Sequence, residues 1–354
     1  MSARRGRTLT ATLALAAFAV WTLAAAAGAP SNESISIGII DFYGLSKLSA
    51  DRARTALTVH EGDTIPLAGD GRPAFMAATE ARLAALPGIR KARVNVVCCD
   101  NGRAIVFVGI EERGAATMSF RAAPKGDARL AADIVKAGDE LEKALRLAVQ
   151  RGDAADDRSQ GHALAHDPAS RAVQERFVTY ANRDLPELRR VLRNSSDAAE
   201  RALAAEVLGY AADKAAVVDD LVYAMSDPAE GVRNDAMRAL LVIAEMTPND
   251  GRRVPRIPPQ PFIALLGSPV WSDRNKAAGA LETLTRGRDP GSLKAVRRQA
   301  VPPLSEMARW KSEGHAQPAF LILGRIAGYS DEAALKLWEK GERETVIKAA
   351  ARRQ

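Results

Sequence analysis

The chain has 354 residues, of which 47% are hydrophobic, 26% charged and only 5% aromatic, and its formal net charge is +7. This globular balance argues against a disordered chain, and the length suffices for two or three domains. Three of the positive charges lie in residues 1–29, so the remainder carries only +4 (47 Lys and Arg against 43 Asp and Glu). That charge is too mild to indicate nucleic-acid binding, and no nucleic-acid partner is expected.

Residues 1–29 are predicted to be an export signal. Met1 to Arg7 is basic, an apolar run without charge follows, and small residues end the segment at Ala25 to Ala29. This is the order of a signal peptide with its cleavage site. The apolar stretch 8–29 is also just long enough to span a bilayer as an uncleaved N-terminal anchor. With either alternative, we expect the body of the protein to be periplasmic or secreted, with membrane contact only through residues 8–29.

The next part of the chain is predicted to be a small α+β domain in the order β-α-α-β-β. The expected elements are a strand over residues 34–43, helices over 50–58 and 73–86, and strands over 93–99 and 103–111. In the first strand, Ile35, Ile37 and Ile39 alternate and are expected on one face. Asn101-Gly102 between the last two strands predicts a hairpin, because both turn positions require positive φ. Cys98 and Cys99 are adjacent, and we expect one buried and one exposed thiol.

This domain resembles a POTRA-type domain over residues 34–112. The resemblance rests on the segments IDFYGLSKLSADRARTALTVHEGD, LAALPGIRKARVNVV and GRAIVFVGIEE, in that order. It implies a domain that binds polypeptide, often by adding a strand to the edge of its sheet. Residues 113–183 follow as a helical connector, with helices expected over 127–151 and 170–182 and a polar loop between them.

From residue 184 to the end, the pattern becomes periodic. Arg233, Ala236 and Leu240 recur 41 residues later as Arg274, Ala277 and Leu281. Each unit reads as a first helix, a short turn rich in Ser and Asp, and a second helix. A single helical hairpin cannot bury its apolar faces alone, so about four stacked hairpins are expected to share one core.

The segment SDPAEGVRNDAMRALLVIAEM resembles a HEAT repeat, and residues 184–354 therefore resemble an all-α HEAT-like solenoid. In that family, an Asp and an Arg from successive repeats typically form a ladder along the turns. The resemblance implies such a ladder at these positions: Asp197, Arg201, Asp227, Arg233, Asp273 and Arg274. Trp271 and Trp310 lie in or beside the same helices, and an aromatic side chain on the concave face would anchor a partner.

One polar loop invites an enzymatic interpretation. Asp157, Ser159 and His162 lie together within residues 152–168, but the chain has no G-x-S-x-G elbow. Catalytic triads usually draw their members from distant parts of a chain, and Asp and Ser commonly cap helices. We therefore expect no catalytic, cofactor-binding or metal-binding residues.

The sequence as a whole indicates a non-enzymatic, exported scaffold whose solenoid holds a protein or peptide partner. The POTRA-like sheet edge offers a further place for strand addition. One alternative is a membrane-anchored envelope assembly or division factor, because an N-terminal anchor before a POTRA-like domain is also the layout of bacterial septum proteins. A second alternative is a hydrolase that uses Asp157, Ser159 and His162.

Overall fold

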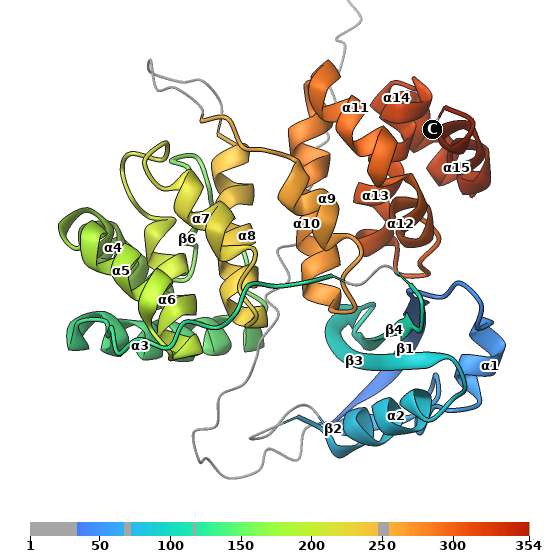
Figure 1. The fold of residues 1–354 in the computed structure, drawn as a ribbon, viewed down its shortest axis with the longest axis horizontal. Coiled ribbons are helices and arrows are strands. Elements are labelled where there is room, and N and C mark those ends of the chain that lie inside the picture. Colours follow the sequence, from blue (N-terminus) through green and yellow to red (C-terminus); the bar gives the residue numbers. More distant parts are fainter. Residues whose placement is uncertain (1–33, 67–71, 116–117, 247–254, 354) are drawn as a thin grey trace, which may run out of the picture.

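The computed structural model describes residues 34–66, 72–115, 118–246 and 255–353 (Figure 1). The predicted export signal at residues 1–29 lies outside the described residues. No helix in the described ranges is both long enough and apolar enough to cross a membrane. The expected small sheet followed by a helical region is confirmed. We call residues 34–115 the head and residues 118–353 the body.

The head is a four-stranded sheet, in the order β2-β1-β4-β3, with both helices packed on one face. Its elements are β1 (Ser34–Tyr43), α1 (Ala50–Arg54), β2 (Thr64–Pro66), α2 (Ala74–Ala84), β3 (Ile89–Asp100) and β4 (Arg103–Glu112). β1 runs parallel to β4 and antiparallel to β2. The predicted hairpin is confirmed: β3 and β4 are antiparallel, and Asn101 and Gly102 have φ values of 50° and 72°.

Three details of the head differ from the sequence prediction. The register of β1 on β4 shifts between Ile37 and Ile39, and the predicted common face for Ile35, Ile37 and Ile39 is wrong. Ile37 is buried under α1 and α2, whereas Ile39 packs on the opposite face, because an extra residue reverses the alternation beyond it. The unexpected strand β2 pairs with the start of β1. Cys98 and Cys99 are joined to each other as a vicinal disulfide rather than being two separate thiols.

The body is a stack of helix pairs. Its helices are α3 (Ala132–Gln150), α4 (Pro168–Arg183), α5 (Leu185–Asn194), α6 (Ala198–Leu208), α7 (Val218–Ala224), α8 (Glu230–Ala244), α9 (Gln260–Leu265), α10 (Trp271–Arg286), α11 (Pro290–Gln299), α12 (Val301–Met307), α13 (Glu313–Ala327), α14 (Asp331–Glu339) and α15 (Arg343–Ala351). The second helices α6, α8, α10 and α13 pack on one another in sequence order and form one layer. The first helices α5, α7, α9 and α12 each pack on the second helix that follows.

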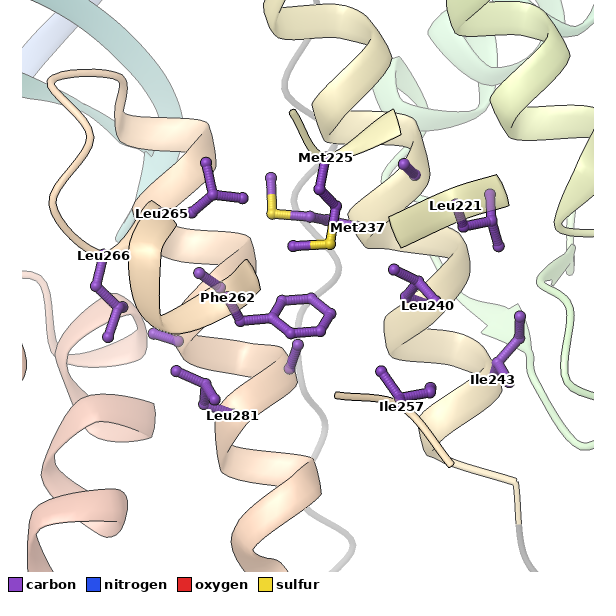
Figure 2. Packing of buried hydrophobic residues seen from close by; sticks show 14 of the residues in the cluster. Leu221, Met225, Met237, Leu240, Ile243, Ile257, Phe262, Leu265, Leu266 and Leu281 are labelled. Carbon is purple, nitrogen blue, oxygen red and sulfur yellow. The ribbon is translucent and has the colours of Figure 1, made fainter. Parts of the chain in front are cut away.

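One hydrophobic core runs through the whole stack. Figure 2 shows part of it, where Phe262 of α9 reaches toward Leu240 of α8 across the joint between two helix pairs. α3 and α4 pack on each other, and α4 also packs on α5 and α6, so residues expected as a connector contribute to the same core. Between α3 and α4, the two-residue strands β5 (Asp156–Asp157) and β6 (Leu164–Ala165) pair.

Candidate functional site

The turns of the stack contain buried arginine–aspartate pairs. The guanidinium of Arg201 donates two hydrogen bonds to Asp227, both 2.9 Å long. The guanidinium of Arg233 donates two to Asp273, of 2.9 and 2.8 Å. Both arginine side chains are only 2% exposed and both carboxylates are fully buried. Each Arg thus binds the Asp of the next helix pair, which is the ladder that the resemblance implied.

The ladder changes its chemistry at its ends. Asp197 is exposed and caps α6 by accepting hydrogen bonds from the N–H groups of Ala199 and Glu200. At the other end, Arg274 binds the carboxylate of Glu306 on α12 at 2.8 Å, where the sequence pattern gave no acidic partner. Because Pro302 and Pro303 interrupt the periodicity before Glu306, the repeat offset alone could not identify this residue.

An extended segment of the chain itself covers the ladder. Residues 118–131, which we call the strap, run from the head across α8 and α6 to α3 (Figure 1). The Arg233 guanidinium lies 3.9 Å from the centre of the Phe120 ring. The N–H of Arg121 donates to the carbonyl of Ser226 at 2.9 Å, and its side chain binds Asp227. The ladder therefore holds neighbouring helix pairs and the strap together. The side of the ladder that faces the strap is already covered by residues 118–131 of the chain itself.

The two tryptophans expected at a partner surface are buried instead. Trp271 is 0% and Trp310 2% exposed. Their rings lie 5.1 and 5.0 Å from the ring of Phe107 in the head, and Tyr43 of the head donates its hydroxyl to the carbonyl of Pro269 at 3.0 Å. The partner that these tryptophans contact is the sheet of the head, so the head is packed on the body through an aromatic core.

The three residues considered for hydrolysis, Asp157, Ser159 and His162, do not form a common site, because Asp157 and His162 contact different groups. Asp157 accepts a hydrogen bond from the N–H of Ser159 at 2.9 Å, which is a local turn. The ring of His162 lies 5.4 Å from that of Tyr210, and its Nδ1 is 3.2 Å from the ammonium of Lys214. Across the described ranges, no group of three His, Cys, Asp or Glu side chains is placed to hold a metal ion.

The layer of second helices carries a row of half-buried charged residues, which we call the polar strip. It consists of Glu206 on α6, Asp235 and Arg238 on α8, and Lys276 on α10. Small residues let α6 and α8 approach closely on this side: a methyl group built on Gly209 would lie 2.7 Å from the Cβ of Ala239, and one built on Gly231 would lie 3.7 Å from that of Ala202. These two contacts place Glu206 beside Asp235.

Three members of the polar strip, Glu206, Asp235 and Lys276, form no ion pair among the described residues, whereas Arg238 pairs with Asp156. Burial raises the pKa of Glu206, the charge of Asp235 raises it further, and burial also raises the pKa of Asp235. Burial, assisted by the charge of Arg238, lowers the pKa of Lys276 to about 8. In the part of the chain that the structure describes, the Glu206 carboxylate and the Lys276 ammonium form no hydrogen bond or ion pair, and Asp235 accepts only from Asn234, at 2.9 Å. Half-buried charges without partners are costly, and they mark places where a ligand can supply the missing groups.

The loop between α3 and α4 borders the polar strip. Arg158 binds Asp156 at 2.7 Å and Glu245 at 3.1 Å, and Asp156 binds Arg238 at 3.3 Å. A cavity of about 30 Å³, large enough to hold a water molecule, lies between this loop and the pair Glu206–Asp235. Sequence reasoning missed the strip because each residue by itself looks like an ordinary solvated helix position. The small residues facing one another on α6 and α8 were the available signal.

The edge of the sheet formed by β3 is partly blocked by side chains of the head. The N–H of Val94, in the middle of β3, donates to Glu80 at 2.6 Å, and its carbonyl accepts from Arg72 at 2.8 Å. Arg72 and Glu80 also form an ion pair with each other. An incoming strand would have to displace both side chains before it could pair with Val94.

Comparison with known proteins gives no family: no family model matches the chain, and no curated protein matches it. Among solved structures, the chain is similar to computationally designed armadillo repeat proteins for modular peptide recognition, with 17% identity over 52% of this chain and 93% of that chain, at a TM-score of 0.35. It is also similar to a designed armadillo repeat protein in complex with the peptide (KR)4, with 16% identity over 53% of this chain and 95% of that chain, at a TM-score of 0.35.

Proposed function

We propose that the protein is an exported, non-enzymatic scaffold that binds an extended protein segment along the polar strip. The observation that supports the proposal is that Glu206, Asp235 and Lys276, half-buried on the neighbouring helices α6, α8 and α10, form no ion pair within the described ranges. Glu206 and Asp235 lie at one end of the row and Lys276 at the other. A partner that pairs these groups recovers the desolvation cost that the free protein already bears.

The spacing of the helices defines what such a partner looks like. Packed helices lie about 8–10 Å apart, and an extended chain rises about 3.3 Å per residue, so a peptide that crosses the layer meets a new helix about every three residues. Glu206 and Lys276 are two helices apart, which corresponds to about five or six residues of peptide. The favoured partner therefore carries a basic residue followed or preceded, about five or six positions away, by an acidic residue.

The two resemblances support the same class of function. A HEAT-like body and a POTRA-like head are both folds that hold polypeptide. Strand addition at β3 is restricted to the backbone on either side of Val94, because Arg72 and Glu80 occupy both hydrogen-bonding groups of that residue. Export through residues 1–29 belongs to the proposal, and sequencing the N-terminus of the mature protein tests it: a start near Gly28 or Pro30 identifies a cleaved signal, whereas an intact Met1 identifies an anchor.

A peptide selection tests the binding site. Displayed random 12-residue peptides are selected on the purified protein, and the enriched peptides are measured by fluorescence polarisation against Glu206→Gln, Asp235→Asn and Lys276→Gln. The proposal expects enrichment of the basic–acidic spacing and at least a tenfold weaker affinity for each variant, since a hydrogen bond to a charged group is worth about 1.5–3 kcal/mol.

The matched control removes an exposed charge elsewhere on the body. Lys336 and Glu332 form a surface pair on α14, with side chains 67% and 79% exposed, so Lys336→Gln should leave binding unchanged. Peptides that bind the three polar-strip variants as tightly as the wild type would place recognition elsewhere and reject the proposal.

A further inference from the structure

A cleft lies where the head meets the body. This open cleft of about 610 Å³ separates the end of β1, the loop after it and α1 from α12. We call it the junction cleft. Its apolar walls include Phe42 and Leu45 of the head and Pro302, Pro303 and Trp310 of the body. This volume is in the range of pockets that enclose a small-molecule ligand, so it can admit the last residue of a peptide.

The walls of the junction cleft are held in place before anything binds. The N–H of Gly44 donates to the carboxylate of Glu306 at 2.6 Å, which ties the loop after β1 to α12. The N–H groups of Ser46, Lys47 and Leu48 all donate to the carboxylate of Glu112, at 2.8–2.9 Å. A cleft that is already ordered loses little conformational entropy on binding.

Two arginines line the cleft, Arg54 and Arg309, and of these only Arg54 forms no ion pair within the described ranges. Glu306 is paired with Arg274 at 2.8 Å, and Arg309, just beyond the end of α12 on the same wall, is paired with Glu344 at 2.6 Å. Asp41 accepts from the N–H of Lys311 at 2.9 Å. Arg54 differs, because within the described ranges it forms no ion pair. Its guanidinium lies 5.2 Å from the centre of the Phe42 ring, and its single hydrogen bond, to the carbonyl of Ile40, is 3.5 Å long.

We propose that the junction cleft binds the carboxyl-terminal residue of a partner polypeptide. The last side chain is apolar and packs against Phe42 and Pro303, while the terminal carboxylate pairs with the guanidinium of Arg54. The planar fork of arginine matches a carboxylate in two parallel hydrogen bonds, and the acids around the cleft are already bound to other groups and do not compete. This site acts independently of the polar strip.

Fluorescein-labelled pentapeptides that differ only in their last side chain or in their C-terminal group test this inference by fluorescence polarisation. The set contains Gly-Ser-Gly-Ser-Leu as the free acid, the same peptide as the carboxamide, and Gly-Ser-Gly-Ser-Asp as the free acid. The inference expects the leucine acid to bind about tenfold or more tightly than either of the others. Arg54→Gln should remove the preference for the acid, and Arg54→Lys should restore part of it.

Two controls make the result decisive. Arg52→Gln changes an exposed arginine on the same short helix that does not line the cleft, and it should leave the preference intact. Glu206→Gln should also leave it intact, which separates this site from the polar strip. Equal binding of the acid and the carboxamide, no binding of the leucine acid, or equally tight competition by N-acetyl-leucine, which would identify a small-molecule acid site, would each overturn the inference.

Discussion

The buried pair Arg233–Asp273 should show strong energetic coupling, and a double-mutant cycle measures it. The proposed changes are Arg233→Met, Asp273→Ala and the two together. The pair is bidentate, at 2.9 and 2.8 Å, with side chains 2% and 0% exposed. Each single change leaves a buried charge without its counter-charge, which typically costs about 3–5 kcal/mol.

The double variant should be far less destabilised than the sum of the singles. Removing both charges also removes both desolvation costs, and replacing a buried ion pair by apolar groups is often close to neutral. The double variant still loses two further hydrogen bonds. One is donated by the Ser268 hydroxyl to Asp273 (2.6 Å), and the other by Arg233 to the carbonyl of Asp227 (2.8 Å). Each group left unsatisfied costs about 1–3 kcal/mol. The expected coupling energy is therefore about 2 kcal/mol or more.

Guanidinium unfolding of the four proteins, followed by far-UV circular dichroism and tryptophan fluorescence, gives the cycle. Trp271 lies two residues before Asp273 and reports locally on unfolding. The matched control is the pair Arg309–Glu344, which is also bidentate, at 2.6 and 3.0 Å, but 50% and 49% exposed. Its cycle should give only about 0.2–1 kcal/mol. Equal coupling in the two cycles would refute the argument that burial, rather than geometry, sets the strength of the ladder.

Three further changes test the head and its attachment to the body. Burial alone would raise the pKa of Glu112, but the hydrogen bonds that it accepts lower it to about 2. The charged carboxylate therefore stabilises the fold above pH 4.5, and the deficit of Glu112→Gln in urea melts should shrink as the pH falls from 4.5 toward 2. In Gly109→Ala, the new methyl group would overlap the carbonyl oxygen of Pro269, so the head should detach and become sensitive to limited proteolysis. Gly287→Ala, whose methyl group meets nothing within 4 Å, should stay resistant. Trp310→Phe should cost clearly less than the roughly 3–5 kcal/mol of Trp310→Ala in the same melts, because no acceptor in the described residues binds the indole N–H.

Local features of the fold were predictable from the sequence because their signals are local. The turn Asn101-Gly102 identified the β3–β4 hairpin, since few residues adopt positive φ. The turn residues Asp227, Arg233 and Asp273 belong to segments that resemble HEAT repeats, and that resemblance, rather than the 41-residue offset, implied the ladder. The face of Ile39 was not predictable, because a shift of one residue in register leaves no mark on an alternating sequence.

Contacts between distant segments were not predictable for a different reason. Trp271 and Trp310 are large aromatic residues of the kind that often anchor a binding partner. Only the three-dimensional arrangement shows that Phe107 and Tyr43 of the head already pack against them. The polar strip illustrates the converse. Glu206 resembles any solvent-facing helical glutamate until the close approach of α6 and α8 restricts its access to water.

The attachment of the head also imposes an order on biosynthesis. Phe107 is made about 200 residues before Trp310, the body residue that covers part of its ring. At typical rates of 5–20 residues per second, one face of the finished sheet remains uncovered for roughly 10–40 seconds during translation. A growing chain in that interval exposes an apolar sheet face to the cell, so chains that stop before α10 should aggregate, whereas chains completed through α13 should not.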